Sequence, residues 1–227
     1  SARDVALSFV FTGQGAQWFA MGRELLTGSS AFRASIVDSD AVMKALGSEW
    51  DLVEELSRSK ATSRVGESRF SQPLTTAVQI ALVDLLATYG VVPEAVCGHS
   101  SGEVAAAYAA GALSRQAAMQ VAYMRGIYSA EAKGLNATPG AMLAVGEGEE
   151  AVSERIAQLD SKSGKVVVAC VNSPESTTIS GDVDAILALQ GVLTRRACST
   201  GSSRWTRRTT RTTWRSSRSS ISRPSRT

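Results

Sequence analysis

Apolar residues follow two different spacings along the chain. The short apolar runs 5–11 and 95–97 are each followed by a glycine-containing turn, which is typical of buried strands. In 74–89 the apolar side chains recur every third or fourth residue and predict one face of a helix: 74, 77, 78, 81, 82, 85 and 86. Gly90 stands where a C-terminal helix cap is expected, and another helix is expected from Gln17.

A strand, a sharp turn and two helices are expected next. The run 95–97 leads into Gly-His-Ser-Ser-Gly at 98–102, and an alanine-rich segment that favours helix follows. Gly111 ends this helix, Ser114 is a candidate N-cap for the next, and 117–132 continues that helix. Strands that alternate with helices indicate the α/β class.

The order of elements changes in the following part of the chain. Strands are expected at 141–145, 165–171 and 176–180, and helices at 149–159 and 185–192. This β-α-β-β-α order is most of a split βαβ sandwich. One strand is missing from it, and the chain instead enters a segment of unusual composition.

Charge is distributed unevenly along the chain. The 24 basic and 21 acidic residues give a net charge of +3. The last 34 residues, 194–227, hold 10 Arg, 9 Ser and 8 Thr with no Asp, Glu or Lys, so the part before them has a net charge of −7. We therefore expect an α/β core at 1–134, an incomplete smaller subdomain at 135–193 and a disordered, aberrant tail at 194–227.

Several classes of protein are excluded by residue usage. Cys97, Cys170 and Cys198 are scattered without CxxC spacing, which indicates neither a disulfide framework nor a zinc site. His99 is the only histidine, so no metal site made of clustered imidazoles is expected. No bound metal and no bound cofactor are expected. No apolar run approaches the ~18–20 residues that span a bilayer, and no signal-peptide pattern is present. We expect no membrane partner and a reducing, cytoplasmic setting, with Cys97 and Cys170 as small buried hydrophobes.

Residues 98–102 fit G-x-S-x-G, the nucleophile elbow. This chemistry needs glycines around the serine because the turn from strand to helix is tight and strained, which exposes the serine hydroxyl. Ser100 would also sit at a helix N-terminus, where free backbone N–H groups face a developing oxyanion. The five-residue pattern alone is common. The strand before it and the alanine-rich helix after it make Ser100 the candidate nucleophile.

Three further positions allow two readings each. Thr-Gly-Gln-Gly at 12–15 is either a plain turn or a loop that brings the Gln14 N–H to Ser100 as an oxyanion donor. Arg125 on an apolar helix face either reaches solvent, which the residues alone favour, or clamps a carboxylate in a bidentate pair. His99 is adjacent to Ser100 and is expected to point away from it, as a structural histidine with its hydrogen bonds satisfied.

Five blocks stand in order along the chain: Phe11-Thr-Gly-Gln-Gly-Ala-Gln-Trp, Phe70-Ser-Gln-Pro-Leu, Gly98-His-Ser-Ser-Gly-Glu-Val-Ala-Ala-Ala-Tyr, Tyr123-Met-Arg-Gly and Val171-Asn-Ser-Pro-Glu-Ser. Together they resemble the malonyl-CoA:acyl-carrier-protein transacylase family, and more closely the acyltransferase domain of fungal, iterative, highly reducing polyketide synthases. The resemblance covers residue 5 to about residue 193. It implies an α/β-hydrolase-like core that carries a ferredoxin-like subdomain, here incomplete.

The resemblance also implies a ping-pong transfer with malonyl-CoA as the substrate. Ser100 attacks the malonyl thioester, and the phosphopantetheine thiol of an acyl carrier protein then takes the malonyl group; ketosynthase domains of the parent synthase are further implied partners. The other implied site residues are the two oxyanion donors, the carboxylate-binding residue and the pocket residues: the backbone N–H groups of Gln14 and Ser101, then Arg125, and then Gln72, His99 and Asn172.

The chain departs from the family at the general base. The family has a histidine well after the serine, whereas the corresponding part of this chain is rich in Arg and Thr and has no histidine. Codons for 203–215 can be chosen so that a one-nucleotide shift reads Leu-Lys-Val-Asp-Thr-Ala-Tyr-His-Ser-His-His-Met-Glu, which resembles the missing block, with the base histidine at Thr210. We therefore expect a frameshift near Leu193, biological or from sequencing. Thr-Ala-Tyr-His in the shifted frame favours malonyl over methylmalonyl for the parent gene.

Two other functions use the same features. A serine esterase or thioesterase would use the same elbow, but Arg125 favours transfer because a charged clamp would hinder neutral esters. A non-enzymatic fragment could instead bind nucleic acid through its basic tail, with Trp205 and Trp214 stacking on bases; we expect no nucleic-acid partner, because out-of-frame codons explain the same composition. Without its histidine the chain is expected to be impaired or inactive, and without its closing strand only marginally stable.

Overall fold

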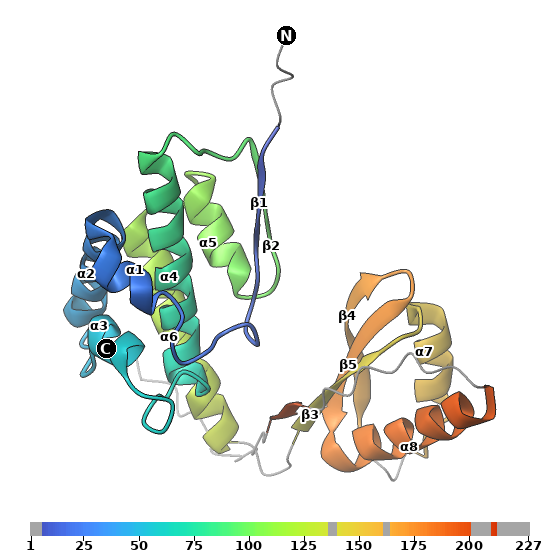
Figure 1. Ribbon diagram of the computed structural model, residues 1–227. Helices are drawn as coiled ribbons and strands as arrows, with labels where there is room; N and C mark the ends of the chain where they lie inside the picture. The colour runs from blue at the N-terminus through green and yellow to red at the C-terminus, as the bar shows by residue number, and fades with distance from the viewer. Residues whose placement is uncertain (1–5, 136–139, 161–163, 201–209, 213–227) are drawn as a thin grey trace, which may run out of the picture. The chain divides into compact units, whose positions relative to one another are not determined.

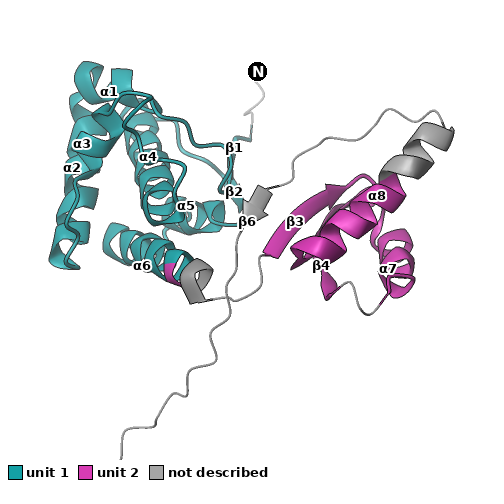
Figure 2. Ribbon diagram, turned by 90° about the horizontal axis from the view of Figure 1, so that it is seen from below, with its two compact units in different colours: residues 1–130 teal, residues 131–227 magenta. Residues whose placement is uncertain are grey.

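The computed structural model describes residues 6–135, 140–160, 164–200 and 210–212 (Figure 1). The chain divides into two compact units, Ser1–Ala130 and Glu131–Thr227, which Figure 2 colours separately. Both units combine helices and strands, which confirms the α/β class.

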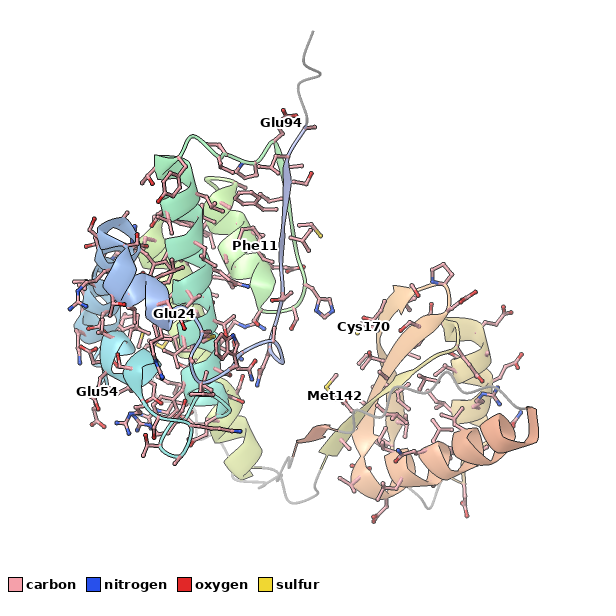
Figure 3. All side chains as sticks on the ribbon, viewed as in Figure 1. Phe11, Glu24, Glu54, Glu94, Met142 and Cys170 are labelled. Carbon is pink, nitrogen blue, oxygen red and sulfur yellow. The ribbon has the colours of Figure 1, made fainter. Side chains whose placement is uncertain are left out.

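The first unit contains a two-stranded parallel sheet. β1 (Ser8–Phe11) and β2 (Ala95–Gly98) pair in register from Ser8 and Ala95 to Phe11 and Gly98, which confirms both expected strands. α5 (Gly102–Ala109) lies against one face of this sheet. Phe11, labelled in Figure 3, points from β1 toward α5 and packs with Ala105 and Ala106. The pairing places the ends of β1 and β2 side by side.

Five further helices complete this unit: α1 (Arg23–Gly28), α2 (Ser30–Ala45), α3 (Leu52–Ser57), α4 (Ser68–Thr88) and α6 (Arg115–Leu135). Their shared core includes fully buried side chains from four of them, among them Phe32, Leu52, Leu74, Ile80 and Met119. The apolar stripe of α4 is therefore confirmed as a core face. Through the contacts of this core, α4 is held beside α5 and the two-stranded sheet.

The expected helix caps at Gly90 and Ser114 are confirmed, whereas two helices begin at other residues than expected. Gly90 has φ 75°, and Val91 N–H donates to the Leu86 carbonyl at 3.0 Å, which closes α4 with a Schellman motif. Ser114 Oγ accepts from the N–H of Ala117 at 3.1 Å, as an N-cap does.

The helix expected from Gln17 is wrong, because the chain turns there until Gly22. Gly22 has φ 73°, and a Cβ on it would lie 2.9 Å from the Phe32 ring, so the helix begins only at Arg23. α4 begins at Ser68, before the expected residue 74, and includes Pro73 in its second turn. Proline has no backbone N–H, so α4 lacks the hydrogen bond that residue 73 would otherwise donate to the carbonyl of Arg69.

The second unit is a four-stranded sheet with two helices. Its elements are β3 (Gly140–Val145), α7 (Glu149–Ala157), β4 (Val166–Ser173), β5 (Ser176–Asp182), α8 (Val183–Thr200) and β6 (Thr210–Thr212). The strand order is β4-β5-β3-β6, and every pair is antiparallel. Side chains of the sheet and both helices form its core, among them Leu143, Val152, Ile179, Ile186 and Leu189.

The expectation of a missing fourth strand is wrong. β6 comes from the tail and pairs with β3, with Thr212 opposite Gly140 and Thr210 opposite Met142. α8 also continues to Thr200, beyond the expected helix end at 192 and the expected domain end at 193. A strand joins the edge of a sheet through backbone hydrogen bonds, which segments of many different sequences can make. Threonine, found at both ends of β6, is also common in strands. Residues 194–200 of the expected tail thus belong to α8 and residues 210–212 to β6, and its other positions lie outside the described residues.

Cys97 and Cys170 are exposed, so their expected burial is wrong. A strand alternates its faces, and Cys97 lies on the face of β2 opposite Val96, which packs toward α5. A register shift between Val168 and Cys170 changes the facing of β4. Within the described ranges, no group of three or more His, Cys, Asp or Glu side chains could hold a metal ion.

α4 is the one described helix whose length and hydropathy would allow it to cross a membrane. Its most apolar window is 67% buried within this unit, as expected of a core helix.

Candidate active site

The turn between β2 and α5 has the backbone geometry of a nucleophile elbow. Ser100 has φ 55°, and no other non-glycine residue in the described part of the chain has a positive φ. A Cβ on Gly98 would lie 2.4 Å from Glu103 Cα, and a Cβ on Gly102 would lie 2.3 Å from the Phe11 carbonyl oxygen. Neither contact is possible, so both glycines are required by the close packing. This confirms the expected strained turn.

The elbow exposes Ser100 and places free N–H groups beside it. Ser100 is exposed, whereas Ser101 is buried and is the residue directly before α5, without a capping hydrogen bond from its side chain. The backbone N–H of Ser101 donates to no residue among those described. It lies at the positive end of the α5 dipole, where negative charge is stabilised. An oxyanion formed next to Ser100 would therefore find in the Ser101 N–H a free hydrogen-bond donor.

The loop after β1 packs directly on the elbow. His99 N–H donates to the Phe11 carbonyl at 2.9 Å and extends the strand pairing. A Cβ on Gly13 would lie 2.6 Å from the His99 carbonyl oxygen and 3.4 Å from Ser100 Oγ. Gln14 follows Gly13, and its backbone N–H also donates to no residue that the structure describes. The parallel pairing thus brings the loop that contains Gln14 to Ser100.

Arg125 and Gln72 meet where α4 and α6 cross. A Cβ on Gly126 would lie 3.1 Å from the Ser68 carbonyl oxygen, so glycine permits the close approach of the two helices. Arg125 Nε donates to Gln72 Oε1 at 3.2 Å, and Gln72 Nε2 donates to Ser129 Oγ at 3.4 Å. Gln72 is buried and Arg125 is exposed.

Arg125 has no carboxylate partner among the described residues. Its bond to Gln72 uses one N–H and leaves the other guanidinium N–H groups free for an anionic ligand. The Arg125 side chain therefore reaches solvent, which is the reading that the apolar pattern alone favoured. Its Nε is held by the hydrogen bond to Gln72.

Three further expected positions are each described by their own surroundings. His99 is exposed, and its imidazole makes no hydrogen bond to a residue in the described ranges, so the expectation of a satisfied structural histidine is wrong. Asn172 lies on β4 of the second unit and donates from Nδ2 to Thr178 Oγ1 at 2.9 Å. Thr210 lies on β6, and its side chain is outside the described residues.

A charged network that links α5 to α4, α6 and α2 was not predicted from the sequence. Tyr108 of α5 donates to Asp84 of α4 at 2.6 Å, and Arg115 of α6 pairs with the same carboxylate at 2.8 Å. Arg115 also donates to Ser35 Oγ of α2 at 2.7 Å. Burial, and next the hydrogen bond to Asp84, raises the pKa of Tyr108 to about 12. These partners are far apart in sequence, so no local pattern signals them.

Comparisons with known proteins agree with the geometry of the elbow. Residues 8–201 match the family described as the acyl transferase domain. Over 189 residues the chain is 53% identical to a highly reducing polyketide synthase of Sordaria araneosa, covering 83% of this chain and 6% of that protein. Over 187 residues it is 52% identical to the squalestatin tetraketide synthase of Phoma sp., covering 82% of this chain and 7% of that protein. The chain thus spans less than a tenth of the length of these relatives.

Solved structures of the same kind are also similar. A loading acyltransferase from the avermectin modular polyketide synthase has a TM-score of 0.73 and 33% identity, over 92% of this chain and 62% of that chain. The malonyl CoA-acyl carrier protein transacylase from Clostridium perfringens has a TM-score of 0.72 and 26% identity, over 85% of this chain and 58% of that chain. The chain belongs to the acyl transferase domain family, and it is an acyltransferase domain similar to those of fungal highly reducing polyketide synthases.

Proposed function

We propose that this domain transfers a malonyl group from malonyl-CoA to the phosphopantetheine thiol of an acyl carrier protein. The observation that carries the proposal is the strained Ser100, exposed at the N-terminus of α5 between two close-packed glycines. Ser100 Oγ attacks the thioester carbonyl, the carbon–sulfur bond breaks, and CoA leaves as the thiol with the hydroxyl proton. The carrier thiol then attacks the malonyl-serine, and Ser100 regains a proton.

Charge that develops on the carbonyl oxygen is stabilised by two backbone groups. The N–H groups of Gln14 and Ser101 donate to it, and each such donor typically contributes ~10²–10³ in rate. Arg125 binds the malonyl carboxylate, oriented by its bond to Gln72. His99, next to Ser100 in the chain, is a further proposed pocket residue.

The general base is absent in this proposal. The family's histidine would stand at Thr210, and a frameshift near Leu193 removed it; an unbroken original frame in resequenced coding DNA would contradict this. Without a positioned base, acylation of Ser100 is slowed by ~10²–10⁴. The serine then reacts at a rate set by the oxyanion donors and by substrate binding.

The finer fold and the setting belong to the same proposal. The sheet order β4-β5-β3-β6 supports a ferredoxin-like subdomain, at 135–193 plus the strand β6. Residues 1–134 are proposed to form an α/β-hydrolase-like core. Ketosynthase and carrier-protein domains of a parent synthase are the partners, in the cytoplasm.

Intact-mass analysis after mixing with malonyl-CoA tests the proposal. We expect a slowly formed malonyl adduct that Ser100→Ala abolishes and that a carrier protein removes. Ser153→Ala, at an exposed position of α7, is the matched control and keeps the adduct. Hydrolysis of neutral esters without any adduct from malonyl-CoA would instead indicate an esterase.

A further inference from the structure

The loop that carries Gln14 lies along one face of α4. At its start, Gln79 Nε2 donates to the Thr12 carbonyl at 2.8 Å. At its end, a Cβ on Gly22 would lie 3.6 Å from Val78 Cγ2. Both ends of the loop therefore lie close to α4, and Gln79 is the residue of α4 that bonds to the loop backbone.

The orientation of the Gln79 amide is determined by this bond. If the amide were reversed, Oε1 would face the Thr12 carbonyl, and two acceptors cannot hydrogen-bond. Oε1 is buried and has no hydrogen-bond partner in the described part of the chain. Leaving a buried oxygen unpaired costs free energy. The Gln79 amide therefore pairs the Thr12 carbonyl of the loop, while its own oxygen stays unpaired.

The loop needs such a restraint because its sequence permits many conformations. Glycine precedes and follows Gln14, and Gly15 has φ 122°. Gly15 N–H donates to Gln17 Oε1 at 2.6 Å, which is a bond within the loop and fixes nothing to the rest of the unit. The bond from Gln79 fixes the plane of the Thr12–Gly13 peptide, one peptide before the N–H of Gln14.

We propose that Gln79 is a positioning residue that holds the Thr12 carbonyl so that the Gln14 N–H stays directed at the oxyanion formed on Ser100. Gln79 does not touch the substrate and acts only through the loop. The inference rests on the proposed acyl transfer for its catalytic consequence, whereas the restraint on the loop can be measured without activity.

Gln79→Met tests the restraint, because methionine keeps the length of the side chain and removes the donor. Gln120→Met, at an exposed position of α6, is the matched control. We expect NMR order parameters of the Gly13, Gln14 and Gly15 N–H groups to fall from ~0.85 toward 0.6 or below in Gln79→Met only. The rate of malonyl-serine formation at saturating malonyl-CoA should fall ~10–10³-fold, while the half-saturating concentration stays unchanged.

The two readouts separate the inference from the proposed function. If wild-type protein forms no malonyl adduct, the proposed function fails, and the order parameters alone decide the restraint. Unchanged order parameters and an unchanged rate in Gln79→Met would overturn the inference. If Gln79→Met does not fold, Gln79→Glu replaces it: its carboxylate cannot donate, so the loop should be mobile at neutral pH and regain order when acid protonates the carboxyl group. Mobility that does not respond to pH would overturn the inference.

Discussion

Gly13 is the residue at which backbone packing and chemistry are most closely linked. Gly13→Ala places a methyl group 2.6 Å from the His99 carbonyl and 2.8 Å from Ser100 Cβ, so the loop or the elbow must shift. We expect a loss of stability of ~1–3 kcal/mol, as for other overpacked sites, together with loss of the malonyl adduct. Urea unfolding and intact-mass analysis measure the two effects.

Gly28→Ala is the control for this substitution. No atom lies within 4 Å of the added Cβ, so the change should be neutral or stabilising by up to ~1 kcal/mol. An adduct that forms equally fast in Gly13→Ala and Gly28→Ala would show that the loop does not support the reaction at Ser100.

Some single residues could be predicted from the sequence and others could not. The φ of Ser100 and the need for Gly98 and Gly102 follow from a local turn, so a five-residue pattern contains the information. The bond from Gln79 to Thr12 joins residues 67 positions apart and has no local signal. Cys97 was misassigned because sequence fixes the alternation of a strand but not which of its two faces a helix covers.

At the scale of elements, Tyr108 and Asp84 join α5 to α4 and thereby support the helix that begins at the elbow. Tyr108→Phe removes a hydrogen bond to a charged group, and we expect a loss of ~1.5–3 kcal/mol in the free energy of unfolding near neutral pH. Tyr128→Phe, at a residue of α6 that is 64% exposed, is the matched control and should change little.

The same pair predicts a pH dependence. The pKa of Tyr108 is raised from 10.0 to about 12 in the folded protein, so the unfolded chain releases this proton first. The stabilisation is therefore complete below pH 10 and is lost as the pH rises toward 12. Urea unfolding at several alkaline pH values should show the difference between wild type and Tyr108→Phe shrinking above pH 10, and a constant difference would contradict this assignment.

Elements with a regular spacing of apolar residues could be predicted from the sequence, whereas elements whose bounds depend on tertiary contacts could not. The stripe of α4 and its glycine cap are local features of one segment. α1 starts only after Gly22, which has φ 73° and has no room for a Cβ beside the Phe32 ring, and the sequence around Gln17 does not reveal this. β6 was missed because a strand at the edge of a sheet is defined by its partner β3 rather than by its own apolar pattern.

At the scale of the whole molecule, the tail contributes structure to the second unit although its composition is foreign to the rest of the chain. Truncation after Leu193 removes the last residues of α8 and all of β6, and leaves β3 as an open edge. We expect the second unit to lose ~1–3 kcal/mol, from several backbone hydrogen bonds, and to self-associate through the exposed edge.

Truncation after Thr212 is the matched control, because it shortens the tail and keeps β6. The first unit has its own core of α1 to α6 side chains, so its unfolding should be the same in both truncated chains. Thermal unfolding followed by calorimetry, with light scattering for self-association, separates the units. Equal stability of the two truncated chains would mean that the β3–β6 pairing does not stabilise the unit, and the sandwich would then be complete without its fourth strand.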